Sequence, residues 1–300
     1  MLGIFYYPWY GNATNPIEKW RQWNKEGRNP PQTWAAQYLP DVSGPDATTE
    51  KRLYDSFDID VVNRQMQLIK DCGIDFVIWS WMGSDKYSEK TMSNWWTKGT
   101  NPAGLKHCIY HERLWYFPEI TENFMIKEIN YVKSKYAKDS RYLKINSKPV
   151  VFVYSIKPGD RDNVDANAYQ IELIKKWGRV RKATGVYTVL KTMLGDGWMN
   201  YKSNADSWHQ YKPTVPYVKV ANYSSSVSPG FWRLNEPTPR LARDTTRFKN
   251  DLIKMKNDSG SLNLIISWNE WGEGTGIEPA SIGTGASYGN TYTSIVNEVF

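Results

Sequence analysis

The residues best suited to chemistry lie near the end of the chain, in the segment Trp268–Pro279, which reads WNEWGEGTGIEP. Glu270 and Glu273 are three residues apart and follow a strongly apolar run. In a turn or a first helical turn, this spacing puts both side chains on one side. Two carboxylates that face one cavity raise each other's cost of ionisation, so one can serve as an acid and the other as a base. Cleavage of a glycosidic bond requires that division.

The other residue types in this segment favour the same chemistry. Its three glycines would let a substrate approach the backbone closely. Trp268 and Trp271 offer flat faces for a sugar ring. The alternative is a solvated polar loop in which Glu270 and Glu273 are caps. So many chemically active residues in one short segment favour a functional site instead.

Aromatic residues gather in two further places. The segment Phe5–Gly11 reads FYYPWYG, and strand alternation sends Tyr6 and Tyr7 to opposite faces, so that one of them can reach a site. Trp79 and Trp81 share a face, and one or both could form the floor of a sugar subsite. The alternatives are a packed aromatic corner and a core position for Trp79. The chain has 15 tryptophans and 20 tyrosines against 9 phenylalanines, which suits stacking on sugars with hydrogen bonds to their hydroxyls.

Other chemistries find less support in the sequence. His107 and His111 have a spacing that can bind zinc on a helix, but no third ligand follows at a conventional distance, so no metal is expected. Neither Cys72 nor Cys108 lies in a CxxC or protease pattern, and no Gly-x-Ser-x-Gly elbow occurs. The sequence therefore disfavours nucleophilic acyl transfer.

The net charge of +7 raises nucleic acid as a partner. The densest basic cluster, Lys175–Lys182, fits the solvated face of a helix, and no known nucleic-acid module surrounds it, so nucleic acid is not expected. No apolar run is long enough to span a bilayer. The first residues lack a basic segment and a cleavage site, so no signal peptide is expected and the compartment stays open between the cytoplasm and an exported protein that has lost its leader.

The elements that must position these residues alternate between strands and helices. Apolar runs predict strands at 4–7, 74–81, 149–154, 186–190, 205–209, 218–222 and 262–268. Helical periodicity predicts helices at 58–72, 121–136, from Asp165 to just before Gly185, at 243–256 and over the last dozen residues. Residues 8–57 and 82–120 are expected to be long, Trp-rich loops.

This alternation predicts parallel βα units, arranged either as a (β/α)8 barrel or as an open doubly wound sheet. No glycine-rich dinucleotide or phosphate fingerprint follows a strand. The polar and aromatic residues instead follow strand ends, where barrel enzymes build their sites. We therefore expect a single (β/α)8 TIM barrel with long βα loops over residues 1–300.

Six segments together resemble a known family. They are YYPWYG at 6–11, KDCGIDFVIWSW at 70–81, IYHE at 109–112, KPVVFVY at 148–154, SVSPGFW at 226–232 and WNEWGEGTGIEP at 268–279. Their types and order resemble glycoside hydrolase family 99 and the related WbsX-like proteins of polysaccharide gene clusters, over roughly residues 3–280. Gly272 stands where most of the family has histidine, which is closer to the WbsX-like pattern.

The resemblance implies a (β/α)8 barrel, a retaining endo-α-mannosidase or endo-α-1,2-mannanase activity, and no metal or cofactor. It implies that Glu270 is the base acting on the sugar's own 2-hydroxyl and that Glu273 is the acid for the leaving oxygen. It also implies that Glu112 matches a carboxylate of the family's active site, and that either Tyr7 or Tyr10 matches an active-site tyrosine.

The expected partner is an oligo- or polysaccharide, with α-mannan first. The catalytic candidates are Glu270 and Glu273, and the substrate-binding candidates are Tyr7, Tyr10, Trp79, Trp81, Glu112, Tyr154, Asn269, Trp271 and Thr275. Two other functions stay open: a glycosyltransferase-like or processing enzyme of surface polysaccharide assembly, and a non-catalytic glycan-binding barrel.

Overall fold

A computed structural model describes residues 1–41, 48–113, 120–154, 166–192, 195–258, 260–283 and 288–300. Its centre is a sheet of eight parallel strands. They are β1 (Leu2–Tyr6), β3 (Phe76–Trp81), β4 (Lys106–His111), β6 (Lys148–Val153), β7 (Tyr187–Lys191), β8 (Ser207–His209), β10 (Ser224–Val227) and β11 (Leu262–Ile265).

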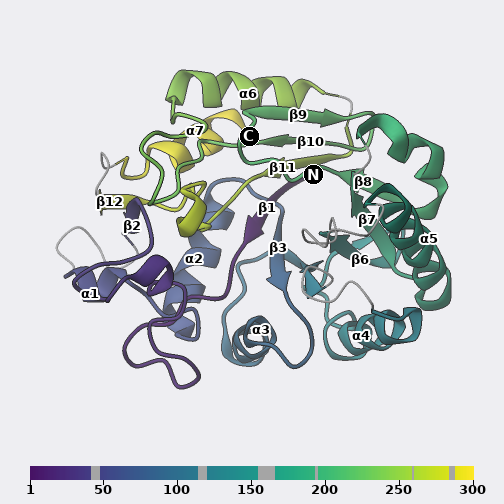
Figure 1. The fold of residues 1–300 in the computed structure, drawn as a ribbon, viewed down its shortest axis with the longest axis horizontal. Helices are drawn as coiled ribbons and strands as arrows, with labels where there is room; N and C mark the ends of the chain where they lie inside the picture. The colour runs from purple at the N-terminus through teal and green to yellow at the C-terminus, as the bar shows by residue number, and fades with distance from the viewer. Residues whose placement is uncertain (42–47, 114–119, 155–165, 193–194, 259, 284–287) are drawn as a thin grey trace.

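The strands are arranged in the order β8-β7-β6-β4-β3-β1-β11-β10, so β1 pairs with both β3 and β11. The sheet curves into a nearly closed barrel (Figure 1). Strand β9 (Tyr217–Val220) is antiparallel to β10 at the seam, and there the Ser224 hydroxyl donates to the Trp208 carbonyl on β8 at 2.9 Å. This arrangement confirms the predicted (β/α)8 barrel.

Helices cover the outside of the barrel (Figure 1). They are α2 (Ile59–Asp71), α3 (Tyr87–Lys98), α4 (Glu122–Lys135), α5 (Ala166–Thr184), α6 (Thr245–Asn257) and α7 (Thr291–Val299). Helices α2 and α4 begin where the sequence predicts, because Asp58 caps one and Thr121 caps the other with a side-chain oxygen. The predicted start of α5 at Asp165 lies outside the described residues.

Shorter elements complete the fold. They are α1 (Thr49–Arg52), the antiparallel pair β2 (Tyr38–Pro40) and β12 (Ala280–Gly283), β5 (Lys144–Ile145) beside β6, and the 3-10 helices η1 (Lys25–Gly27), η3 (Gly195–Asn204) and η4 (Trp271–Glu273). None of the helices in the described ranges is long and apolar enough to cross a membrane.

Two expectations about the elements were wrong. Residues 82–120 are not one long loop, because they contain helix α3 and barrel strand β4. The strand predicted at 218–222 is the antiparallel β9, and the barrel strand of this region is β10, four residues of sequence SSSV. Serine is a poor predictor of a strand, yet Ser224, Ser225 and Ser226 are all buried here.

The barrel interior is aromatic. Phe5, Tyr110, Phe152 and His209 come from four different strands, and the Phe5–Tyr110 and Phe152–His209 ring centroids are 4.9 and 5.3 Å apart. Since successive side chains on a strand point to opposite faces, Trp79, Trp81, His107 and His111 face the surrounding helices instead. The interior layer supports the loops at the carboxyl ends of the strands, where the site lies.

Candidate active site

The carboxyl end of β11 leads directly into the glutamate pair. Glu270 precedes η4 and Glu273 ends it, and the Glu270 amide donates to the Ser267 hydroxyl at 2.9 Å. Gly274 then closes the turn in the left-handed region, with φ +63°, and a Cβ there would lie 2.7 Å from the Trp232 carbonyl oxygen. Only glycine fits this position, so Gly274 fixes the path of the chain after Glu273.

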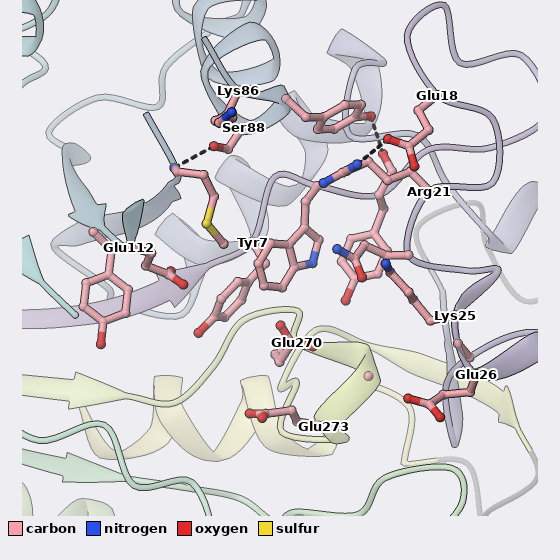
Figure 2. A pocket seen from close by; sticks show the side chains of 18 of the residues that line it. Tyr7, Glu18, Arg21, Lys25, Glu26, Lys86, Ser88, Glu112, Glu270 and Glu273 are labelled. Carbon is pink, nitrogen blue, oxygen red and sulfur yellow. Dashed lines mark hydrogen bonds and ion pairs between the residues drawn. The ribbon is translucent and has the colours of Figure 1, made fainter. Parts of the chain in front are cut away.

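A cavity of about 1090 Å³ opens above this turn. Its walls come from loops that follow several strands. The lining residues include Tyr7, Trp9, Tyr10, Tyr110, Glu112, Tyr154, Tyr211, Arg233, Glu270, Gly272 and Glu273 at the inner end, and Ile17, Glu18, Arg21, Lys25, Glu26, Asp85, Lys86, Lys90 and Glu236 farther out. Figure 2 shows Glu270 and Glu273 on one side of this cavity, with Tyr7 and Glu112 across from them.

The two glutamates of the pair have different surroundings. Glu270 is 8% exposed, and burial raises its pKa well above the usual value, with Glu273 and Glu112 adding to the rise. Burial also raises the pKa of Glu273, but there the Arg233 guanidinium donates to Oε1 at 2.9 Å and lowers it. Between the two carboxyls, a proton therefore prefers Glu270, and a negative charge prefers Glu273.

A third carboxylate and a lysine lie across the cavity. Burial raises the pKa of Glu112 to about 8, and its Oε1 has no hydrogen-bond partner among the described residues. The Lys191 ammonium lies 3.8 Å from the centre of the Tyr154 ring, and burial lowers its pKa to about 8 although Glu112 and Glu273 oppose the shift. Burial thus disfavours the charged form of both groups on this side of the cavity.

The structure separates the two candidate tyrosines. The Tyr7 hydroxyl donates to the Tyr211 hydroxyl at 2.6 Å, and both rings line the cavity. The Tyr10 hydroxyl accepts from the Trp271 backbone amide at 2.9 Å, which ties it to the turn that carries Glu270 and Glu273. Of the two, Tyr7 has the hydroxyl that is better placed to meet a substrate.

Asn269 and Trp271 lie beneath the cavity rather than on its wall. Asn269 accepts from the Tyr7 amide at 2.7 Å and donates to the Tyr54 hydroxyl at 2.9 Å, and Trp271 Nε1 donates to the same hydroxyl at 3.1 Å. The Tyr54 hydroxyl in turn donates to the buried Glu278 at 3.2 Å. These residues connect the turn after β11 to the one after β1, so they are positioned to orient the site.

Thr275 has a similar place, because its hydroxyl is 2.9 Å from that of Ser267, beneath the turn. Of the three glycines, Gly272 alone lines the cavity. A Cβ at Gly276 would lie 3.0 Å from the Trp268 carbonyl oxygen, so Gly276, like Gly274, serves close backbone packing. The expectation that all three glycines open the backbone to substrate was therefore wrong for two of them.

Trp79 and Trp81 do not reach the cavity. Trp79 Nε1 donates to His107 Nδ1 at 3.0 Å, and Trp81 Nε1 donates to Glu89 on α3 at 2.7 Å. Both side chains are fully buried between the sheet and the helices. Their positions do not support the prediction that they form a sugar subsite, because the alternation of strand β3 turns them away from the barrel mouth.

The two spaced histidines lie on strand β4, not on a helix. His107 Nε2 is 2.6 Å from Asn101 Oδ1, so both of its ring nitrogens are used in hydrogen bonds. His111 packs between Trp81 and Trp177. Burial lowers the pKa of each histidine to about 3. Within the described ranges, no group of three potential metal ligands occurs.

The sequence did not single out several residues that line the cavity or lie beside its wall. Lys191 and Tyr211 each follow a predicted strand by one or two residues, so the rule that found Tyr154 also applies to them. Trp9 is within the FYYPWYG segment, and its ring lies 4.6 Å from that of Tyr7. No sequence pattern singled out Arg233, because only folding brings it to Glu273.

A nearly closed parallel barrel with carboxylates gathered at the carboxyl ends of its strands has the architecture of a barrel enzyme. Residues 1–170 match the sequence model of Glycosyl hydrolase family 99, and the chain belongs to this family. The family and the barrel together support a glycoside hydrolase-like function with a carbohydrate substrate.

Solved structures share the fold. The GH99 endo-α-mannosidase from Bacteroides thetaiotaomicron, in complex with bis-tris-propane, superposes with a TM-score of 0.74 at 17% identity, over 99% of this chain and 95% of that one. A glycoside hydrolase-like protein superposes with a TM-score of 0.64 at 14% identity, over 100% and 93% of the two chains. At these identities the similarity shows the barrel fold alone.

Proposed function

We propose that this chain is a retaining, endo-acting α-glycosidase that hydrolyses α-mannoside linkages in a mannan or a related microbial polysaccharide. The observation that carries the proposal is the pair Glu270 and Glu273, which lie side by side on the wall of a deep cavity in different electrostatic surroundings. The cavity volume is large enough for more than one sugar unit, as cleavage within a chain requires.

In the proposed mechanism, Glu270 takes the proton of the substrate's 2-hydroxyl while the 2-oxygen attacks the anomeric carbon. Glu273 gives its proton to the leaving glycosidic oxygen, and a 1,2-anhydro sugar forms. Glu273 then takes a proton from water as the water oxygen attacks the anomeric carbon, and Glu270 returns its proton to the 2-oxygen. Two inversions give net retention, without a carboxylate nucleophile.

This cycle begins with a proton on Glu273 and a charge on Glu270, the reverse of what the protein neighbours of the two carboxyls favour. The Arg233 side chain is 51% exposed, so the substrate can displace it from Glu273 without a buried cation being stranded. Loss of the Arg233 contact raises the pKa of Glu273, because that contact lowers it. We therefore expect substrate binding to set the catalytic protonation state.

Five other residues would complete the site. Tyr7 and Tyr211 form a hydroxyl pair that can bind a sugar hydroxyl, and Glu112 and Tyr154 line the cavity on the same side. Trp9 is the aromatic surface best placed for stacking, since its ring lines the cavity and is partly exposed. Asn269, Trp271 and Thr275 are proposed as positioning residues rather than substrate contacts.

The test is incubation with a panel of α-mannans and bacterial exopolysaccharides, followed by product sizing and by NMR of the first anomer released. Oligosaccharides with retained α-configuration are expected. Glu270→Gln and Glu273→Gln should each lower kcat at least about 100-fold with the fold intact, which is the usual scale for loss of a general acid or base. Glu26→Gln, on the outer rim of the same cavity, is the matched control and should stay near wild type.

The outcomes separate the candidate functions. Wild-type rates in either glutamine variant would remove that residue from the mechanism. Turnover of a sugar nucleotide with no glycan cleavage would favour the transferase-like alternative. Binding of a glycan with no turnover of any kind would favour a non-catalytic barrel.

A further inference from the structure

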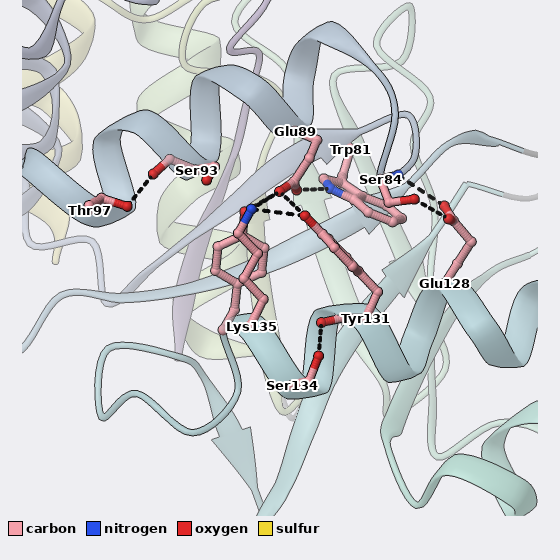
Figure 3. A network of polar contacts seen from close by, with 10 residues as sticks. Trp81, Ser84, Glu89, Ser93, Thr97, Glu128, Tyr131, Ser134 and Lys135 are labelled. Carbon is pink, nitrogen blue, oxygen red and sulfur yellow. Dashed lines mark hydrogen bonds and ion pairs between the residues drawn. The ribbon is translucent and has the colours of Figure 1, made fainter.

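A second depression of about 620 Å³ lies outside the barrel, between α3 and α4 and beside the loop after β1. Its volume is within the range of about 300–1,000 Å³ that is usual for small-ligand sites. The lining residues are Pro16, Ile17, Phe57, Ser84, Glu89, Lys90, Ser93, Asn94, Thr97, Lys98, Tyr131 and Lys135. We call this depression the α3 groove, and Figure 3 shows the polar network at its base.

The α3 groove adjoins the catalytic cavity. Ile17 and Lys90 line both of them. Ile17 is 37% exposed, so an apolar side chain faces water at the junction of the two depressions. A long ligand that leaves the cavity at this point would pass over Ile17 and enter the groove, and the apolar face of a sugar ring suits such a contact.

The base of the groove is held rigidly. Buried Glu89 accepts from Trp81 Nε1 at 2.7 Å, from the Tyr131 hydroxyl at 2.6 Å and from Lys135 Nζ at 2.6 Å, and the Tyr136 hydroxyl adds a fourth bond at 2.7 Å (Figure 3). The charges of Glu89 and Lys135 therefore satisfy each other. A site ordered before binding loses less entropy when a ligand arrives.

Two further lysines line the walls of the groove. Lys90 and Lys98 are exposed, and no acidic partner for either is found within the described residues. Beside them, the Thr97 hydroxyl donates to the Ser93 carbonyl at 2.8 Å, and Asn94 donates to the Phe57 carbonyl at 2.9 Å, which fixes the polar side chains between the two lysines. The groove thus combines ordered polar groups with uncompensated positive charge, which attracts an anion.

We propose that the α3 groove binds the distal units of the same polysaccharide chain that the cavity cleaves, and that it prefers units with an acidic substituent such as a phosphate or a carboxylate. This inference rests on the proposed function for the identity of the polymer. It goes beyond that function in assigning a second, remote binding site and the charge of the ligand there.

The experiment compares neutral α-mannan with phosphomannan, an α-mannan that carries phosphate, by affinity electrophoresis of the full chain in gels containing each polymer. Lys98→Ala removes one groove charge at the last turn of α3, where alanine is a good helix former. Lys98→Arg keeps the charge. The matched control is Lys127→Ala, which removes an exposed lysine from α4 outside both depressions.

Wild type should be retarded more by phosphomannan than by neutral mannan. Lys98→Ala should weaken binding to phosphomannan about twofold to fivefold, the scale of one exposed charge pair, with neutral mannan unaffected. Lys98→Arg and Lys127→Ala should both behave as wild type. Equal retardation by the two polymers, or an equal loss in Lys127→Ala, would overturn the inference.

Cleavage assays on the same two polymers keep the two proposals apart. If wild type cleaves neither polymer, the proposed function fails whatever the gels show. If it cleaves α-mannan but Lys98→Ala binds phosphomannan as well as wild type does, the groove inference alone fails. A preference for phosphomannan that depends on Lys98 supports the groove in either case.

Discussion

The buried carboxyl of Glu278 should make the protein less stable as the pH rises through the neutral range. Burial raises its pKa to about 8 from an ordinary value of 4.5, although Gln65 and Tyr54 donate hydrogen bonds to it. Between these two values the unfolded chain has released a proton that the folded protein still holds. The free energy of unfolding therefore falls by about 1.4 kcal/mol per pH unit from this group alone.

Glu278→Gln removes this titration and keeps the size of the side chain. Between pH 5.5 and 7.5, the wild type should lose about 2.5 kcal/mol more than the variant. Urea unfolding followed by tryptophan fluorescence at several pH values gives both slopes, and the slopes are the readout because the substitution also changes the absolute stability. Glu298→Gln, at a carboxylate that is 60% exposed, controls for loss of a surface carboxylate.

If Glu278→Gln and wild type have parallel slopes, then Glu278 is ionised in the folded protein and its hydrogen bonds outweigh burial. If Glu298→Gln flattens the slope as much as Glu278→Gln does, the effect comes from overall charge. Either result would refute the argument that burial controls this carboxyl.

Two further predictions concern groups that hold the site. Arg233→Met removes the cation that lowers the pKa of Glu273. If Glu273 is the acid, the alkaline limb of the pH profile of kcat/KM should therefore move to higher pH. A shift of the acidic limb instead would assign Glu273 as the base. Tyr54→Phe leaves Trp271 Nε1 without its hydroxyl partner. The variant should lower the free energy of unfolding in urea by about 1–3 kcal/mol and should also lower kcat. A stability equal to wild type would mean that another group replaces this hydrogen bond.

The apolar pattern predicted most of the barrel because buried parallel strands form nearly continuous apolar runs. Phe76–Trp81 and Leu262–Ile265 are of this type. Strand β4 was missed because its outward positions hold His107 and His111. The imidazole of His107 is satisfied by Trp79 on the neighbouring strand β3 and by Asn101 in the loop before β4. Such partners exist only after folding, so the local sequence reads as polar.

Strand β10 was missed for a related reason. The buried hydroxyl of Ser224 donates to the Trp208 carbonyl, and that of Ser225 donates to Asp258 at 3.0 Å. Each partner comes from another part of the chain, so a run of serines that predicts a loop is stable as a barrel strand. The pattern of residue types could not reveal these bonds.

The residues of the candidate site were likewise predictable only where the pattern is local. The Glu270–Glu273 motif is local, so its spacing was enough to predict that the two carboxylates share a cavity, and both line it. Trp79 and Trp81 were placed on one face correctly, but the choice between the barrel mouth and the helical layer depends on where strand β3 lies in the sheet. Arg233 is 40 residues from its partner Glu273, and no local pattern connects them.

The surroundings of the glutamate pair show why spacing alone could not assign its roles. Two identical side chains three residues apart differ here because Glu270 turns into a buried position near Glu112, whereas Glu273 meets Arg233 from the loop after β10. That contrast favours a proton on Glu270, while the proposed mechanism begins with one on Glu273. Displacement of Arg233 by substrate would remove the hydrogen bond that lowers the pKa of Glu273, so the half-exposed arginine is the part of the site on which the proposed mechanism most depends.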